Sequence, residues 1–265
     1  RLSADVALEY SLACDKGTAA RNAFSPSANI RYAIIDGLEV TALGRRMYRI
    51  PTFNELYYVG YGNPELKPED AWTCDLGIQF NRQISKDWKI TAGLNGFYTI
   101  LTDKITSAPT EEDPNVWMPI NIGKVRSTGL DSRVGADFKH NNWRAGMSIG
   151  YSYLSSIDKT PDSYSYGQQI PYIAKHTVTA DMKAAWKGYT LNPRWVLKTG
   201  RTDGTGSIAD WNTLDLTFTK RFEIKDALSV GVNISAKNLL NSRYELVSGY
   251  PMPGRSFIGG VEFTF

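Results

Sequence analysis

The sequence predicts an all-β fold, namely a transmembrane antiparallel β-barrel of which about twelve strands lie in this chain. Three observations support this prediction. Apolar and polar residues alternate with a period of two, the connections between the alternating segments are short and long in turn, and tryptophans gather at both ends of the segments. An outer-membrane barrel has all three features, because each strand presents one face to lipid and the other to the lumen.

The alternation defines the strands in chain order. The even positions from Leu2 to Leu12 are apolar, as are the odd positions from Trp143 to Tyr153 and the even positions from Leu228 to Ala236. The opposite positions are rich in Ser, Thr, Asn and Gly, which favours a crowded lumen over the Lys- and Glu-rich face of a soluble sandwich. The predicted strands are 2–14, 26–35, 38–49, 70–82, 88–105, 117–139, 142–157, 172–186, 189–200, 208–222, 228–241 and 254–265. No convincing helix is expected, although the loops could hold a short one.

Every second connection between these strands is short. The short ones are 35–37, 83–87, 140–142, 187–189 and 224–227, and the long ones are 15–25, 50–69, 106–116, 158–171, 201–207 and 242–253. Outer-membrane barrels have tight periplasmic turns and longer extracellular loops. Tryptophans follow the same division: Trp88, Trp143 and Trp186 lie beside short turns, Trp72, Trp117 and Trp211 lie beside long loops, and Trp195 lies within a strand. Two such belts indicate two membrane interfaces.

Composition excludes several other classes of protein. The chain has 265 residues and a net charge of +3, which is too balanced to indicate a nucleic-acid partner. Two Cys cannot form a disulfide scaffold, and two His, His140 and His176, suggest neither a metal centre nor a catalytic triad. No apolar run approaches the ~18 residues of a transmembrane helix. We therefore expect no catalytic residues, no metal site and no cofactor, and hence a protein that is not an enzyme.

Three motifs resemble those of TonB-dependent outer-membrane transporters. The first is a pair of boxes that contains Tyr48, Arg49, Pro51, Asn63, Pro64, Leu66, Pro68 and Glu69. The second is the run Asn238–Tyr244 followed by Pro253-Gly254-Arg255, and the third is Gly129-Leu130-Asp131. Their order and spacing make the resemblance specific from about residue 40 to 265. The boxes also have a structural interpretation, because their prolines and Asn63 end strands and shape the long third loop, which Arg49 and Glu69 could close by pairing.

The resemblance implies that residues 1–265 are the C-terminal portion of a barrel of roughly 22 strands, without its plug domain and N-terminal strands. It implies the outer membrane of a Gram-negative bacterium, with membrane lipid and the missing half of the receptor as partners, and the TonB complex as a partner through the plug. A surface lipoprotein could cap the mouth. The last strand, with Gly260, Phe263 and Phe265, resembles the signal that is read by the barrel-assembly machinery.

The expected cargo is a scarce small-molecule nutrient bound by aromatic side chains of the long loops. The candidates are Tyr57, Tyr58, Tyr61, Trp117, Tyr164, Tyr166 and Tyr250. Rings at a barrel mouth suit cobalamin, a ferric siderophore or an oligosaccharide, of which a corrinoid or a siderophore is favoured. The alternative is that each ring only packs its loop. Residues 52–62 contain no His, which disfavours haem. Glu111, Glu112 and Asp113 could bind calcium or form a solvated run.

Two other readings stay open at this point. A complete twelve-stranded outer-membrane barrel, of the autotransporter-translocator or hydrolase type, would close from these residues alone. A soluble β-sandwich or lectin-like adhesin would need no membrane. The paired boxes disfavour the first reading, and the division of tryptophans and loop lengths disfavours the second.

Overall fold

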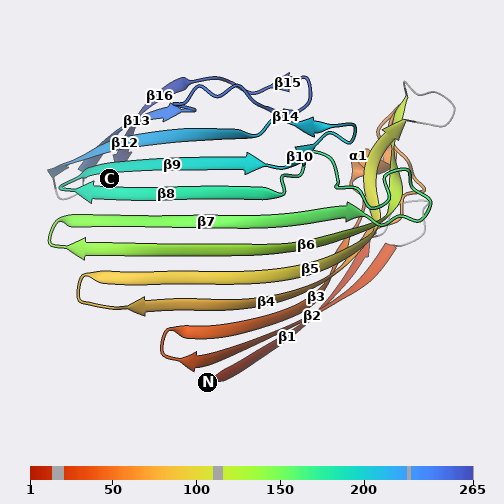
Figure 1. The fold of residues 1–265 in the computed structure, drawn as a ribbon, viewed down its shortest axis with the longest axis horizontal. Coiled ribbons are helices and arrows are strands. Elements are labelled where there is room, and N and C mark those ends of the chain that lie inside the picture. Colours follow the sequence, from red (N-terminus) through yellow and green to blue (C-terminus); the bar gives the residue numbers. More distant parts are fainter. Residues whose placement is uncertain (14–20, 110–115, 226–227, 265) are drawn as a thin grey trace.

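Twelve strands form one antiparallel sheet in which each main strand pairs with the next along the chain (Figure 1). The structure is a computed structural model that describes residues 1–13, 21–109, 116–225 and 228–264. In order across the sheet the strands are β1 (Leu2–Ala13), β2 (Arg21–Ile35), β3 (Leu38–Arg49), β4 (Glu69–Gln83), β5 (Trp88–Pro109), β6 (Trp117–His140), β7 (Trp143–Asp158), β8 (His176–Trp186), β9 (Tyr189–Thr199), β12 (Trp211–Lys225), β13 (Leu228–Lys237) and β16 (Ser256–Thr264). The predicted all-β antiparallel fold is confirmed.

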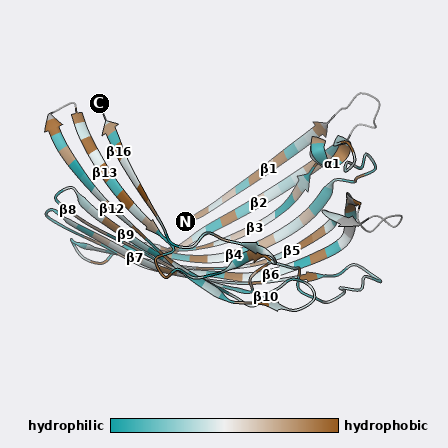
Figure 2. Cartoon of the chain, turned by 90° about the horizontal axis from the view of Figure 1, so that it is seen from above, coloured by the Kyte–Doolittle hydropathy of each residue, from teal (hydrophilic) through white to brown (hydrophobic). Residues whose placement is uncertain are grey.

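The sheet is an open trough and not a closed ring. Its two flanks rise on either side of the middle strands (Figure 2), and its order begins at β1 and ends at β16. Among the described residues, therefore, these two strands do not pair with each other, and the structure does not show the closed twelve-stranded barrel of the alternative reading. Each edge presents backbone donors and acceptors that a neighbouring strand could satisfy.

The two faces of the sheet differ in chemistry as the alternation predicts. We call one the polar face, which carries Thr41, Gln79, Asn95, Asp131 and Thr177 around one hollow. The other is the apolar face, which carries Ile30, Ala42, Leu76 and Tyr98 around another. The free thiol of Cys74 lies on the apolar face and is exposed. Strand register fixes these assignments, because a slip of one residue would exchange the two faces.

Charged side chains cross the polar face as a row of ion pairs. Asp181 on β8 lies 3.3 Å from Arg133 on β6 and 3.6 Å from Arg194 on β9. Asp215 on β12 lies 2.9 Å from Lys237 on β13. Cross-strand pairs of opposite charge stabilise a sheet modestly and help to hold its register.

Some strand bounds differ from those predicted, and backbone geometry explains several of them. The eighth strand begins at His176 and not at 172, where Tyr172 has a left-handed φ of 65°. Strand β13 ends at Lys237, because Asn238 has a φ of 49°. Strand β2 begins at Arg21 and not at 26, so that Pro26 lies inside it opposite Leu8. The fifth strand continues to Pro109, and β12 begins at Trp211.

A short helix and several short strands lie at the end of the sheet that carries the long loops, which we call the long-loop end. They are the five-residue helix α1 (Phe53–Tyr57), the pair β10 (Arg201–Thr202) with β11 (Ser207–Ile208), and the pair β14 (Glu245–Val247) with β15 (Tyr250–Pro251). The alternation of apolar and polar residues does not mark the positions of these elements. Within the described ranges, no helix is long and apolar enough to cross a membrane.

The opposite, short-turn end is held by tight turns. Between β8 and β9, Lys187 and Gly188 have φ values of 45° and 80°, as a type I′ hairpin requires. A side chain at Gly188 would also lie 2.6 Å from the carbonyl oxygen of Arg221. Trp88, Trp143 and Trp186 lie at this end and are exposed, as predicted.

At the long-loop end the tryptophans differ in their exposure to solvent. Trp72 is exposed, whereas Trp211 is buried and stacks on Tyr244 with ring centroids 4.3 Å apart. Trp211 therefore packs within the loops and does not belong to an interfacial belt. The side chain of Trp117 lies outside the described residues.

Candidate functional site

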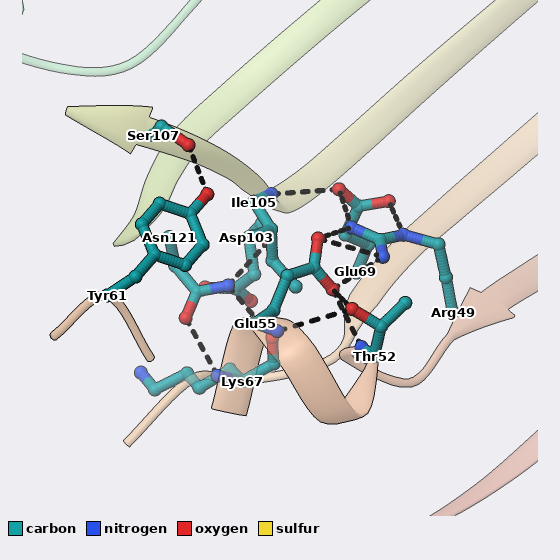
Figure 3. Close-up of polar contacts among 10 residues, drawn as sticks. All are labelled: Arg49, Thr52, Glu55, Tyr61, Lys67, Glu69, Asp103, Ile105, Ser107 and Asn121. Carbon is teal, nitrogen blue, oxygen red and sulfur yellow. Dashed lines mark hydrogen bonds and ion pairs between the residues drawn. The ribbon is translucent and has the colours of Figure 1, made fainter. Parts of the chain in front are cut away.

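At the long-loop end, the loop between β3 and β4 folds back onto β5 and β6 through a network of hydrogen bonds (Figure 3). We call it the β3–β4 clamp, formed by Arg49, Thr52, Glu55, Glu69 and Asn121. Its helix begins with a capping box: the Thr52 hydroxyl accepts from the Glu55 N–H at 3.3 Å, and the Glu55 carboxylate accepts from the Thr52 N–H at 2.7 Å. The Thr-x-x-Glu spacing was the sequence signal that would have located α1.

Arg49 joins the helix to two strands. Its Nε and Nη2 donate to the two carboxylate oxygens of Glu69 at 2.7 and 2.9 Å, and its Nη1 donates to Glu55 at 3.0 Å. Glu69 also accepts from the backbone N–H of Ile105 on β5 at 2.8 Å. The predicted pairing of Arg49 with Glu69 is therefore confirmed. Burial would raise the pKa of Glu55, but hydrogen bonds from Arg49 and Thr52 outweigh it and hold that pKa below its ordinary value.

Asparagines fasten the second box to β6. Asn121 donates to the carbonyls of Lys67 and Asp103 at 2.8 and 2.7 Å and accepts from the Lys67 N–H at 2.7 Å. Asn63 donates to the carbonyl of Pro119 at 3.0 Å. Beneath them Leu66 packs in a buried cluster with Leu56 and Ile105. The remaining box residues are the buried Pro51, the half-buried Tyr48 and Pro68, and the exposed Pro64. The boxes thus shape the loop, as their structural interpretation predicts.

The candidate tyrosines fall into two groups. Tyr57 packs against the buried cluster of the clamp, and the hydroxyls of Tyr61 and Ser107 share a hydrogen bond. These two rings serve loop packing. Tyr58, Tyr164, Tyr166 and Tyr250 are exposed, and Lys159 lies 4.8 Å above the ring of Tyr166. These four are the candidate tyrosines whose rings are exposed. Glu111, Glu112 and Asp113 lie outside the described residues, as does Phe265, whereas Gly260 and Phe263 lie in β16.

Asp158 organises the loop that carries Tyr164 and Tyr166. Its carboxylate accepts from the hydroxyls of Ser163 and Ser165 at 2.7 and 2.6 Å and from the Thr160 N–H at 2.7 Å. Burial raises the pKa of this carboxyl group, but these donors act in the opposite direction more strongly and lower the pKa to about 2. The loop is therefore held by a carboxylate that stays ionised at neutral pH.

We expect Asp158→Asn to loosen this loop by about 1–3 kcal/mol, because the hydroxyls then lose an ionic acceptor. Limited proteolysis between residues 159 and 171 should become about tenfold faster at pH 7, whereas the exposed Asp162→Asn should leave the rate unchanged. Because the pKa of Asp158 is depressed, its contribution is complete above the ordinary pKa near 4 and is lost as the pH falls towards 2. Equal cleavage rates in the two variants would contradict this role.

A cavity of about 800 Å³ lies between the β9–β12 and β13–β16 connections, and its lining includes Arg201, Arg243, Tyr244 and Met252. Arg201 is 4% exposed and donates to the carbonyls of Glu245 and Ala209 at 2.8 and 3.1 Å, so it binds the two connections together. Cavities of this volume suit small molecules. No periodicity or motif in the sequence marked Arg201 as an anchor.

The C-terminal motif supports the same region. Asn238 donates to the carbonyls of Ser242 and Pro253 at 3.0 and 3.3 Å, and Asn241 accepts from the Arg255 N–H at 3.0 Å. In the third motif, a side chain at Gly129 would overlap the ring of Phe97, 2.2 Å away. These motif residues therefore act through packing and backbone contacts.

Comparison with known proteins places this architecture in a family. The family model "TonB dependent receptor-like, beta-barrel" matches residues 3–239. The chain is 25% identical over 246 residues to the vitamin B12 transporter BtuB of Photobacterium profundum, which covers 88% of this chain and 36% of that protein. It is 24% identical over 232 residues to the probable TonB-dependent siderophore receptor PirA of Acinetobacter baumannii, covering 77% of this chain and 31% of that protein.

Solved structures agree on the fold. The copper transporter OprC superposes with a TM-score of 0.66 at 18% identity, covering 93% of this chain and 40% of OprC. The ferric citrate transporter FecA gives a TM-score of 0.66 at 17% identity, covering 92% of this chain and 38% of FecA. The chain thus spans roughly a third of the length of the curated relatives that it matches. Since the family model matches most of its length, the chain belongs to the family of TonB-dependent receptor β-barrels.

Proposed function

We propose that this chain is part of an outer-membrane receptor that binds a scarce nutrient at its long-loop end and imports it with energy supplied through TonB. One observation carries the proposal. The strands match the barrel of the TonB-dependent receptor family, and their long-loop end has exposed aromatic rings and a cavity of a size that suits a small molecule. The family consists of transporters and receptors and not of enzymes. A corrinoid or a ferric siderophore is the proposed cargo, in keeping with relatives named for vitamin B12 and for siderophores.

The proposal includes an N-terminal partner half. In the part of the chain that the structure describes, β1 and β16 end the sheet with unpaired edges, and lipid cannot satisfy such backbone groups. A plug domain and about ten further strands, in the same polypeptide or associated with it, would close a barrel of about 22 strands around a plugged lumen. The plug would then be the part that contacts TonB.

The intact mass of the native outer-membrane protein tests this part. We expect a polypeptide more than twice the 29.6 kDa of this chain, or an N-terminal fragment that co-purifies with it. Mass spectrometry with N-terminal sequencing makes the measurement. A lone 29.6 kDa species that is heat-modifiable and stable in detergent would contradict the half-barrel proposal.

Ligand binding by the whole purified receptor tests the cargo. We expect isothermal titration to detect binding of cyanocobalamin or of a ferric siderophore, and the double substitution Tyr164→Ala/Tyr250→Ala to weaken it about tenfold through loss of ring contacts. The matched control is Tyr32→Ala, which removes an exposed ring from β2 near the short-turn end. Failure of both ligands to bind, or an equal effect of the control, would contradict this assignment.

A further inference from the structure

A cluster of lysines and aromatic rings lies at the short-turn end, across β8, β9 and β12. We call it the lysine–aromatic cluster, formed by Trp186, Lys187, Tyr189, Lys220 and Phe222. The Lys220 ammonium lies 3.7 Å from the ring centroid of Tyr189 and 5.4 Å from that of Phe222. The Lys187 ammonium lies 5.2 Å from the ring centroid of Trp186. Such cation–aromatic contacts are favourable, and they hold both ammonium groups beside the same hairpin turn.

The rings of this cluster continue into a row along the apolar face. Trp143 stacks on Trp186 with centroids 5.5 Å apart, Trp186 stacks on Tyr189 at 6.2 Å, and Tyr189 meets Phe218 at 6.1 Å. All four rings are exposed. Amphipathic rings in such a row mark the depth at which acyl chains meet headgroups.

Lys220 is a charged residue on the apolar face of β12. The described residues on the same side of β12 include Leu216, Phe218 and Phe222, so the side chain of Lys220 starts from a lipid-facing position. Its ammonium group turns to the short-turn end, where it donates to the carbonyl oxygen of Lys187 at 3.0 Å. A lysine stem can cover apolar surface in this way while its charge reaches the interface.

No acidic side chain that the structure describes pairs with either ammonium group. Asp181 of β8 lies on the opposite, polar face, where it pairs with Arg133 and Arg194. Each ammonium has three donors, and the hydrogen bond from Lys220 to the carbonyl oxygen of Lys187 uses one of them. The site thus offers two positive charges and free donors at headgroup depth.

We propose that Lys187 and Lys220 bind the phosphodiester of one anionic phospholipid in the membrane leaflet at the short-turn end, with its acyl chains along Tyr189, Phe218 and Phe222. Charge complementarity selects an anionic lipid, and the row of rings provides the apolar contact below the headgroup. The site lies at the other end of the strands from the proposed nutrient site, so it is a separate function of the barrel wall.

Retention of phosphatidylglycerol by the whole receptor tests the proposal. The receptor is transferred from nanodiscs of phosphatidylglycerol and phosphatidylcholine in equal parts to native mass spectrometry, and bound lipids are counted. We expect one retained phosphatidylglycerol and at least tenfold lower occupancy in Lys187→Gln/Lys220→Gln. The matched control is Lys159→Gln/Lys198→Gln, whose lysines also lie over aromatic rings, 4.8 Å from Tyr166 and 5.8 Å from Trp211, but near the long loops.

Two further measurements test whether the site recognises the phosphate group and whether it also needs the acyl chains. Lys187→Arg/Lys220→Arg should retain the lipid, because guanidinium groups also bind phosphate, so loss of binding in a folded Arg variant would overturn the proposal. Inorganic phosphate at millimolar concentration should fail to displace the lipid, since it lacks the acyl contacts. Equal retention of phosphatidylglycerol by the Gln variant and the control, or equal retention of phosphatidylcholine by the wild type, would also overturn it. Unchanged nutrient binding in the Gln variant would separate this site from the proposed transport function.

Discussion

Arg49→Ala is expected to lower the free energy of unfolding of the receptor by about 1–3 kcal/mol and to release the β3–β4 clamp from β5. The substitution removes a two-bond contact to Glu69 and a further bond to Glu55. It leaves Glu69, whose side chain is 16% exposed, with a negative charge and no cation. Since the arginine side chain is itself 42% exposed, solvent screening reduces the cost below that of a fully buried pair.

The measurement is the midpoint of heat-induced loss of the β-sheet circular dichroism signal, at one scan rate and in one detergent. Arg31→Ala is the matched control, because Arg31 meets Glu39 at 3.7 Å with 52% of its side chain exposed. That change should cost less than about 0.5 kcal/mol. Arg49→Lys should fall between the two, since an ammonium cannot reproduce the planar fork. If Arg49→Ala and Arg31→Ala shift the midpoint equally, the clamp does not stabilise the fold.

The strands were predictable because one physical constraint acts on every residue of them. A sheet with one apolar face must alternate, so the period of two revealed all twelve main strands and their order. Tight turns reinforced this, as at Lys187 and Gly188, where both residues need a positive φ. The bounds were less accurate because single residues decide them. Tyr172 and Asn238 leave the extended region, and nothing in the alternation shows that they will.

The long-loop end was only partly predictable, because its contacts join residues far apart in the sequence. The Arg49–Glu69 pair was expected from two adjacent boxes, but the attachment of Asn121 to Lys67 has no local pattern. The same limit applied to the tyrosines: residue type suggested a binding role for all of them, whereas packing decided that Tyr61 bonds Ser107 and that Tyr58 stays exposed. The strands of a sheet with one apolar face can be predicted from the sequence, whereas the contacts within the loops become known only from the folded structure.

Ile78→Arg is expected to destabilise the membrane-inserted barrel by about 2–4 kcal/mol, whereas Gln79→Arg should cost less than about 1 kcal/mol. The two residues are neighbours on β4 at the same depth, midway between Trp72 and the turn at 84–87. Ile78 pairs with Val40 and Leu94 on the apolar face, while Gln79 lines the polar face. Urea-dependent folding of the whole receptor into phosphatidylcholine vesicles measures both costs. A charge at 78 must enter lipid and one at 79 enters the lumen, so a large difference would show that the apolar face of this trough is the outer wall of a barrel. Equal costs would mean that both faces meet water, and the membrane orientation of the sheet would then be wrong.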